Sequence, residues 1–233
     1  MKIGGVQRFS LIDYPGKICA VVFTQGCNFR CSYCQNPELV EPGLFSLREP
    51  VPEEEVFAFL ERRRGKLDAV VVTGGEPTLQ PDLTDFVRRV KELGFLVKLD
   101  TNGSKPEALK KVVEEVQIDY IAMDVKAPLE RYREVTNSGV DPAKIKQSIG
   151  LIMNSRVDYE FRTTVVKSQL DKRDISEIGR LVRGSKRFVL QRFVPGKVLN
   201  PSCCLSSREI YEDADFEDFQ NVVKRFVREC FVR

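Results

Sequence analysis

The chain alternates short apolar segments with amphipathic ones, and this alternation limits the folds open to it. Six apolar segments stand out, at residues 18–23, 67–73, 95–99, 118–123, 159–166 and 187–193. Short continuous apolar runs are typical of strands that are buried on both faces of a parallel sheet. The stretches between them carry apolar residues at helical spacing. We therefore predict parallel βα units joined by right-handed crossovers.

The helices expected between and after these strands begin near residue 52, cover 81–93 and 105–116, begin near 142, and cover 171–182 and 216–231. No polar linker divides the chain, so we expect one domain over residues 1–233. It would comprise a lead-in (1–17), a barrel (18–200), and a final loop and helix (201–233). A flat dinucleotide-binding sheet would carry a Gly-x-Gly-x-x-Gly turn after its first strand. A cysteine-rich loop occupies that position, and we favour a (β/α)6 partial TIM barrel with parallel strands.

The cysteine loop, residues 26–37, is the most informative motif of the chain. Cys27, Cys31 and Cys34 follow the first strand with the spacing C-x3-C-x2-C. Loops at the carboxyl ends of strands are where α/β proteins place their chemistry. Three nearby thiolates indicate a metal ion or a cluster, but a site coordinated only by thiolates needs four of them. We interpret the missing ligand as one open iron of a [4Fe-4S] cluster, free to bind a small molecule.

Composition excludes several functions. The 233 residues include no histidine, so serine–histidine and cysteine–histidine catalysis are excluded. The net charge of +3 gives no reason to expect nucleic acid or an anionic membrane as a partner. No apolar run approaches the roughly 20 residues that span a bilayer, and residues 1–5 do not resemble a signal peptide. Clustered thiols in a reducing compartment are more often ligands than disulfides, so we expect a cytoplasmic protein.

A zinc-stabilised binding module is the alternative from another functional class. Zinc would need a fourth ligand, drawn from a carboxylate or from Cys19, Cys203, Cys204 or Cys230. We expect Cys19 and Cys230 to pack as core thiols. Cys203 and Cys204 are adjacent, and adjacent cysteines seldom bind one ion together. They are either core thiols or a redox pair near the rim of the barrel.

Polar motifs also follow the next three strands. Gly74-Gly75-Glu76 follows the second, Asp100-Thr101-Asn102 the third, and Asp124 with Lys126 the fourth. Because the strands are parallel, all should face one rim of the barrel. The glycines would let a ligand approach the backbone, and Glu76 would pair with an ammonium group. Asp124 and Lys126 would suit a zwitterionic ligand or a bound cation. Taken singly, these motifs also fit a tight turn and a surface ion pair.

The lead-in contains a turn-rich stretch at residues 10–16. It reads equally well as a plain surface turn or as a segment that closes over the cluster site.

These motifs resemble those of the radical S-adenosylmethionine (SAM) superfamily. The spacing of Cys27, Cys31 and Cys34, with the aromatic Tyr33 before the last cysteine, matches its cluster motif, and residues 74–76 match its SAM-binding motif. Residues 10–16, 34–37, 100–103 and 124–126 resemble the glycyl-radical-enzyme activating enzymes, in particular those of anaerobic ribonucleoside-triphosphate reductase.

The resemblance implies a role for each motif. The cysteines would hold the cluster, and Gly74, Gly75 and Glu76 the amino group of SAM. Asp124 and Lys126 would lie near its carboxylate. The remaining assignments are a monovalent cation at Asp100 and Thr101, and ligand contacts from Arg162 and Gln191.

The implied reaction is reductive cleavage of SAM to a 5′-deoxyadenosyl radical, which takes a hydrogen atom from a glycine of a partner enzyme. No catalytic residue beyond the cluster and SAM is required. The partners would be a glycyl radical enzyme and a low-potential electron donor such as flavodoxin or ferredoxin. An alternative within the superfamily is an enzyme acting on a small molecule, a modified nucleoside or a peptide.

Overall fold

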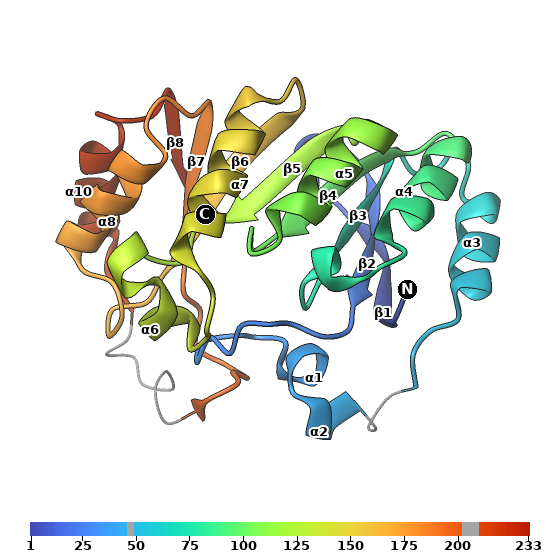
Figure 1. Ribbon diagram of the computed structural model, residues 1–233, viewed down its shortest axis with the longest axis horizontal. Helices are drawn as coiled ribbons and strands as arrows, with labels where there is room; N and C mark the ends of the chain where they lie inside the picture. Colours follow the sequence, from blue (N-terminus) through green and yellow to red (C-terminus); the bar gives the residue numbers. More distant parts are fainter. Residues whose placement is uncertain (46–48, 202–209) are drawn as a thin grey trace.

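The computed structural model describes residues 1–45, 49–201 and 210–233. It contains one eight-stranded sheet whose strands lie side by side in chain order. The strands are β1 (Ile3–Ser10), β2 (Cys19–Thr24), β3 (Ala69–Gly74), β4 (Leu96–Thr101), β5 (Tyr120–Asp124), β6 (Asp158–Val165), β7 (Arg187–Arg192) and β8 (Glu229–Val232). β1 is antiparallel to β2, and every later pair is parallel. The sheet curves into an incomplete barrel (Figure 1), as predicted for a partial TIM barrel.

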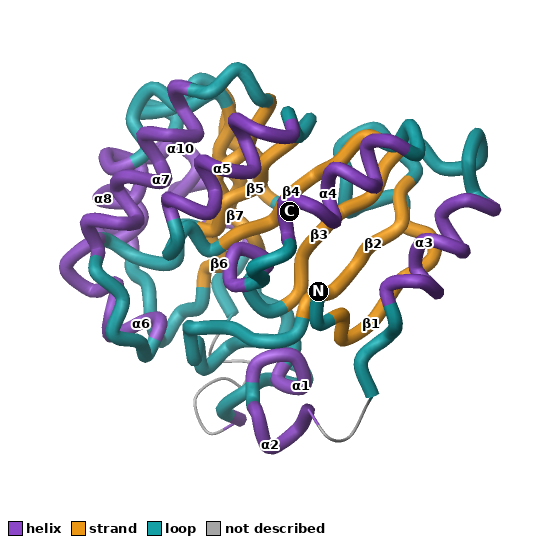
Figure 2. The backbone as a smooth tube through the Cα atoms, turned by 45° about the vertical axis from the view of Figure 1, so that its right-hand side comes forward, coloured by secondary structure: helices purple, strands orange, loops and turns teal. Residues whose placement is uncertain are grey.

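Helices cover the outer face of this curved sheet (Figure 2). They are α3 (Glu53–Arg62), α4 (Leu83–Glu92), α5 (Pro106–Val116), α7 (Pro142–Asn154), α8 (Lys172–Leu181) and α10 (Asp213–Val223). The shorter α1 (Pro37–Val40), α2 (Pro42–Phe45) and α6 (Tyr132–Thr136), with the 3-10 turns η1 (Pro77–Leu79) and η2 (Leu129–Arg131), belong to the loops. α1 and α2 lie beyond the carboxyl ends of the strands, at the bottom of Figure 1. Within the described residues, no helix is long and apolar enough to cross a membrane.

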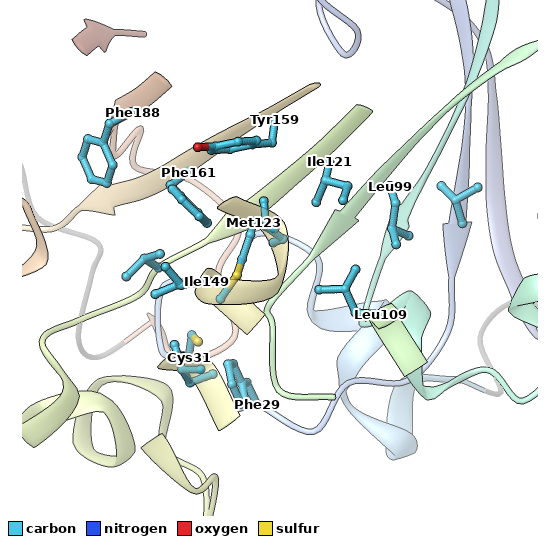
Figure 3. Packing of buried hydrophobic residues seen from close by; sticks show 14 of the residues in the cluster. Phe29, Cys31, Leu99, Leu109, Ile121, Met123, Ile149, Tyr159, Phe161 and Phe188 are labelled. Carbon is cyan, nitrogen blue, oxygen red and sulfur yellow. The ribbon is translucent and has the colours of Figure 1, made fainter. Parts of the chain in front are cut away.

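The two faces of the sheet carry different side chains because successive residues of a strand point to opposite sides. On β3, Val70 and Val72 pack outward into the main core, whereas Ala69 and Val71 point into the barrel. The outer cluster is large and includes Ile121, Met123, Phe161 and Phe188, among the residues shown in Figure 3. The inner cluster is small, and charged residues of β4, β5 and β6 take up much of the remaining interior.

The two ends of the chain differ from the sequence-based expectation of six strands. The lead-in forms β1, whose two glycines and exposed polar residues carry no clear strand signal; pairing with β2 supplies its stability. The predicted last helix ends at Val223 instead of residue 231, and residues 229–232 form β8. In β8 the buried Cys230 lies between two exposed residues, an alternation typical of a strand. Cys230 is therefore a core thiol, as expected, but on a strand.

Residues 10–16 lie at the end of the barrel opposite the cysteine loop, so they do not close over the cluster site. The buried Tyr14 packs with Cys19 and Ala69, which begin β2 and β3, and its ring lies 5.6 Å from that of Tyr120 at the start of β5. Burial raises the pKa of Tyr14 to about 12, and the carboxylates of Asp119 and Asp158 add to this shift. Residues 10–16 therefore cover the end of the barrel at which the parallel strands begin.

Candidate active site

A cavity of about 290 Å³ opens at the carboxyl ends of the strands. Every site residue predicted from the sequence lines it: Cys27, Cys31, Cys34, Gly74, Gly75, Glu76, Asp100, Thr101, Asp124, Lys126, Arg162 and Gln191. These residues come from six successive strands and the loops that follow them. Parallel pairing brings them together because it places all their carboxyl ends at one rim.

The cysteine loop crosses the open side of the barrel from β2 toward α6 (Figure 1). The Arg30 amide donates to the carbonyl of Thr136 at the end of α6, over 2.9 Å. The buried Phe29 anchors the loop by packing edge-on against the ring of Tyr132, with ring centres 6.2 Å apart. Phe29 and Cys31 belong to the same apolar cluster as Met123 (Figure 3). A buried aromatic between the first two cysteines thus fixes where their thiols point.

A second segment, residues 194–200, also forms hydrogen bonds with the cysteine loop. The amide of Leu199 donates to the Cys34 carbonyl, and that of Asn200 to the Ser32 carbonyl, each over 2.9 Å. The Gln35 side chain donates in turn to the carbonyl of Val194 over 2.8 Å. The contacts with α6 and with residues 194–200 therefore limit the positions that the thiols of the cysteine loop can adopt.

Burial controls the protonation of the three thiols. It raises the pKa of Cys27 to about 12 and that of Cys31 to about 11, and it also raises the pKa of Cys34. Without a metal the thiols stay protonated at neutral pH, and a bound metal would displace those protons. The Phe29 amide donates to the Cys27 sulfur over 3.4 Å, a contact that tunes metal-bound thiolates.

This donor set fits a cluster held by three thiolates. Cys19 and Cys230, buried elsewhere, do not line the cavity, and Cys203 and Cys204 lie outside the described residues. Over the described ranges, no three cysteine or carboxylate side chains converge closely enough to hold a single metal ion. A four-iron cluster is larger than one ion, and its thiolates stand correspondingly farther apart. The zinc alternative therefore gains no support from the described cysteines.

The two glycines of the second motif bring two loops into contact. A side chain at Gly75 would collide with the carbonyl of Gly26, and one at Gly74, where φ is +116°, with the backbone of Thr24. The Gly75 amide donates to the Thr24 carbonyl, and the Glu76 amide to the Gly26 carbonyl, each over 2.8 Å. The glycines thus serve first to bind the cysteine loop to the loop after β3, and both also line the cavity.

The Glu76 carboxylate is buried and accepts four hydrogen bonds from the protein. Thr78 donates from its amide (3.1 Å) and its hydroxyl (2.5 Å), the Thr101 hydroxyl donates over 2.7 Å, and the Asn102 amide over 2.6 Å. Burial raises the pKa of Glu76, and these donors oppose the shift. The carboxylate therefore joins the end of β3 to the end of β4. An ammonium ligand would add to these contacts or replace one of them.

Asp124 and Lys126 form an ion pair of 3.0 Å that lines the cavity, rather than a surface pair. Arg162 bridges from β6, with its Nε 2.9 Å from Asp124 and its Nη1 3.2 Å from Asp100. Burial would raise the pKa of Asp124, but Arg162 and Lys126 outweigh it and hold that pKa well below its usual range. Asp124 therefore stays ionised, and the site presents fixed positive charge to a carboxylate ligand.

A residue that sequence reasoning missed lies beneath this group. Lys98, on the inner face of β4, is 2% exposed and forms an ion pair with Asp100. Its signal in the sequence is a lysine within the apolar run 95–99. A monovalent cation, expected at Asp100 and Thr101, would share these residues with positively charged groups of the protein. Lys98 and Arg162 already hold the Asp100 carboxylate, and the Thr101 hydroxyl donates to Glu76.

Comparison with known families agrees with this geometry. The sequence pattern of the Radical SAM superfamily matches residues 21–181, which span β2 to α8 and include all the cysteines of the loop. The chain is a member of the radical SAM superfamily. It is thus a radical SAM enzyme, and membership implies a [4Fe-4S] cluster and SAM as cofactors.

Curated relatives include activating enzymes. The chain is 31% identical, over 99% of its length and 95% of the relative's, to a Methanocaldococcus jannaschii protein named as a glycyl-radical enzyme activating enzyme. It is 27% identical to the pyruvate formate-lyase-activating enzyme of Clostridium pasteurianum, over 83% of this chain and 81% of that one. This radical SAM protein thus resembles the activating enzymes over most of its sequence.

Solved structures share the fold. The structure of Streptococcus suis SuiB bound to SAM superposes with a TM-score of 0.65 at 15% identity, covering 91% of this chain. The present chain spans about half of SuiB, 51% of its length. At this identity the similarity concerns the architecture alone, and it agrees with the radical SAM barrel described above.

Proposed function

We propose that this chain is an activating enzyme that generates a glycyl radical on a partner enzyme, with anaerobic ribonucleoside-triphosphate reductase as the partner. The observation that carries the proposal is the full-length similarity to a relative named as a glycyl-radical enzyme activating enzyme. The gathering of all the predicted site residues around one cavity supports it.

In this proposal Cys27, Cys31 and Cys34 hold a [4Fe-4S] cluster with one iron open to SAM. When bound, the cluster and SAM supply one-electron cleavage and hydrogen-atom abstraction. The protein binds and orients them. The open iron would face the cavity, which Lys126 and Arg162 also line. Those cations would hold the SAM carboxylate.

The amino group of SAM would lie beside Gly74, Gly75 and Glu76. Their backbone is fixed by hydrogen bonds to the end of β2 and to the cysteine loop, so ligand and cluster would share one rigid frame. Gln191, near the end of β7, also lines the cavity and would contact the ligand from that strand. No lining side chain is a histidine, and none needs to act as a base when a hydrogen atom is transferred.

Two further assignments complete the proposal. The electron donor would be a low-potential protein such as flavodoxin or ferredoxin, because the cluster must be reduced by one electron before SAM is cleaved. The location would be cytoplasmic, where the described cysteines, all free thiols, would stay reduced.

The test is electron paramagnetic resonance of the candidate reductase. Anaerobically reconstituted, reduced protein is incubated with SAM and the reductase, and again with a reductase variant whose radical-bearing glycine is replaced by alanine. We expect an organic radical doublet with the unaltered reductase and none with the variant. Cleavage of SAM without any doublet would favour the alternative, a radical SAM enzyme acting on a small molecule, a modified nucleoside or a peptide.

A further inference from the structure

Lys98 lies inside the barrel, where a charged side chain needs a specific reason to be buried. Its side chain is 2% exposed. Burying an ammonium group is costly unless an opposite charge and hydrogen bonds compensate it. The compensation comes from Asp100, two residues along β4 and therefore on the same inner face. Asp100 lines the cavity, whereas Lys98 lies behind it.

Every oxygen of the Asp100 and Asp124 carboxylates has a positively charged donor of the protein. On Asp100, Oδ1 pairs with Lys98, and Oδ2 with Nη1 of Arg162 over 3.2 Å. On Asp124, Oδ1 pairs with Nε of Arg162 over 2.9 Å, and Oδ2 with Lys126 over 3.0 Å. The Thr73 hydroxyl also reaches Oδ2 of Asp100 over 3.4 Å. An added cation at either carboxylate would therefore lie beside a positively charged group of the protein, which repels it.

The charges of this group lead to the same conclusion. Three positive side chains, Lys98, Lys126 and Arg162, face two carboxylates, so the group carries one net positive charge. A ligand carboxylate would neutralise it. An added alkali cation would restore an uncompensated positive charge in a buried site, which is unfavourable.

We propose that Lys98 is a built-in counterion that takes the place of a monovalent cation beside the SAM carboxylate. Lys98 acts through Asp100 and is a positioning residue. SAM binding by this chain is then independent of alkali cations. Loss of the Lys98 charge makes it dependent on them, because Asp100 gains an open oxygen and the group loses its net positive charge. This inference rests on the proposed binding of SAM in the cavity.

The first measurement uses the wild-type protein with its cluster reconstituted. The dissociation constant of SAM is compared in potassium, sodium and tetramethylammonium chloride at equal ionic strength. We expect values within about twofold of one another. The inference would be overturned if SAM bound about tenfold or more tightly in potassium or sodium than in tetramethylammonium, a difference of about 1.4 kcal/mol.

The second measurement uses Lys98→Met, which keeps most of the length of the side chain and removes its charge. In tetramethylammonium chloride we expect SAM binding to weaken by about tenfold or more, and potassium or sodium to restore it in a saturable way. Equal binding by folded, cluster-loaded Lys98→Met in all three salts would overturn the inference. Lys91→Met is the matched control, since it removes a partly exposed ion pair with Asp119 outside the cavity. It should show no cation dependence.

A double variant covers the case in which Lys98→Met folds poorly. Lys98→Met with Asp100→Asn removes both charges of the pair and restores one net positive charge. We expect its SAM binding, even if weaker, to be equal in the three salts; restoration by potassium would contradict the inference.

Thermal unfolding without the cluster gives a readout that does not need SAM. Potassium should raise the Tm of Lys98→Met relative to tetramethylammonium and leave the wild-type Tm unchanged. If the wild-type protein fails to bind SAM in all three salts, that result counts against the proposed function. The Tm values would still test the role of Lys98. If potassium does not raise the Tm of Lys98→Met, the inference about Lys98 is overturned.

Discussion

The amide of Glu76 donates a hydrogen bond to the carbonyl of Gly26 over 2.8 Å, and this contact joins the two loops that form the cavity. Gly26 directly precedes the first cysteine, and Glu76 closes the Gly-Gly-Glu motif. The loop that would hold a cluster and the loop that would hold SAM are thus fixed to each other through their backbones. Such direct coupling keeps two reacting groups in register.

Gly75→Ala tests this coupling. The added methyl group would meet the Gly26 carbonyl, a backbone atom that cannot move without shifting the cysteine loop. We expect a loss of about 1–3 kcal/mol in the free energy of unfolding and reduced iron incorporation on reconstitution. Denaturant unfolding and iron analysis provide the measurements. Gly150→Ala on α7 is the control, because its position has no neighbour within 4 Å and alanine favours a helix. Full iron content in Gly75→Ala would contradict the coupling.

Asp124→Asn tests the ionised carboxylate. The folded-state pKa of Asp124 lies below its usual value of 3.8, because Arg162 and Lys126 outweigh the effect of burial. The folded state therefore binds fewer protons than the unfolded state, and the stabilisation is present above pH 3.8 and lost as pH falls below it. We expect Asp124→Asn to lower the free energy of unfolding by about 3 kcal/mol at pH 6. The difference from wild type should shrink below pH 3.8, as measured by urea unfolding of the cluster-free protein. A constant difference would show that Asp124 is not the ionised partner.

Cys31→Ala separates the cluster thiols from the core thiols. Cys31 lines the cavity, whereas Cys19, which is also buried, lies at the other end of the barrel. We expect Cys31→Ala to lose the iron-dependent absorbance near 400 nm and all SAM cleavage, and Cys19→Ala to keep about four irons per chain. Iron and sulfide analysis with a SAM cleavage assay makes the comparison. Normal turnover by Cys31→Ala would remove Cys31 from the ligand set.

The lining of the cavity could be predicted from the sequence because each motif directly follows an apolar strand. In a parallel sheet, chain order at the strand ends is enough to bring such motifs to one rim. Arg162 and Gln191 lie within strands and were expected at the site only from the family resemblance. Both point inward near the carboxyl ends of β6 and β7 and line the cavity.

What the sequence did not reveal depends on contacts between distant segments. β1 and β8 are the two edge strands, and their residues form strands only through pairing with β2 and β7. The Glu76 carboxylate accepts hydrogen bonds from Thr101 and Asn102, which lie about 25 residues away in the chain. Lys98 was overlooked because an apolar strand pattern predicts burial, and the partner that makes a buried lysine tolerable is known only from the structure.

Mössbauer spectroscopy of protein reconstituted with ⁵⁷Fe tests the central claim, a cluster held by Cys27, Cys31 and Cys34 with one iron open to SAM. Spectra are recorded with and without SAM. We predict that one iron in four changes its isomer shift when SAM is added, because only that iron gains nitrogen and oxygen ligands, while the other three stay unchanged. Four equivalent irons unaffected by SAM, or iron bound in a form other than a four-iron cluster, would contradict the account.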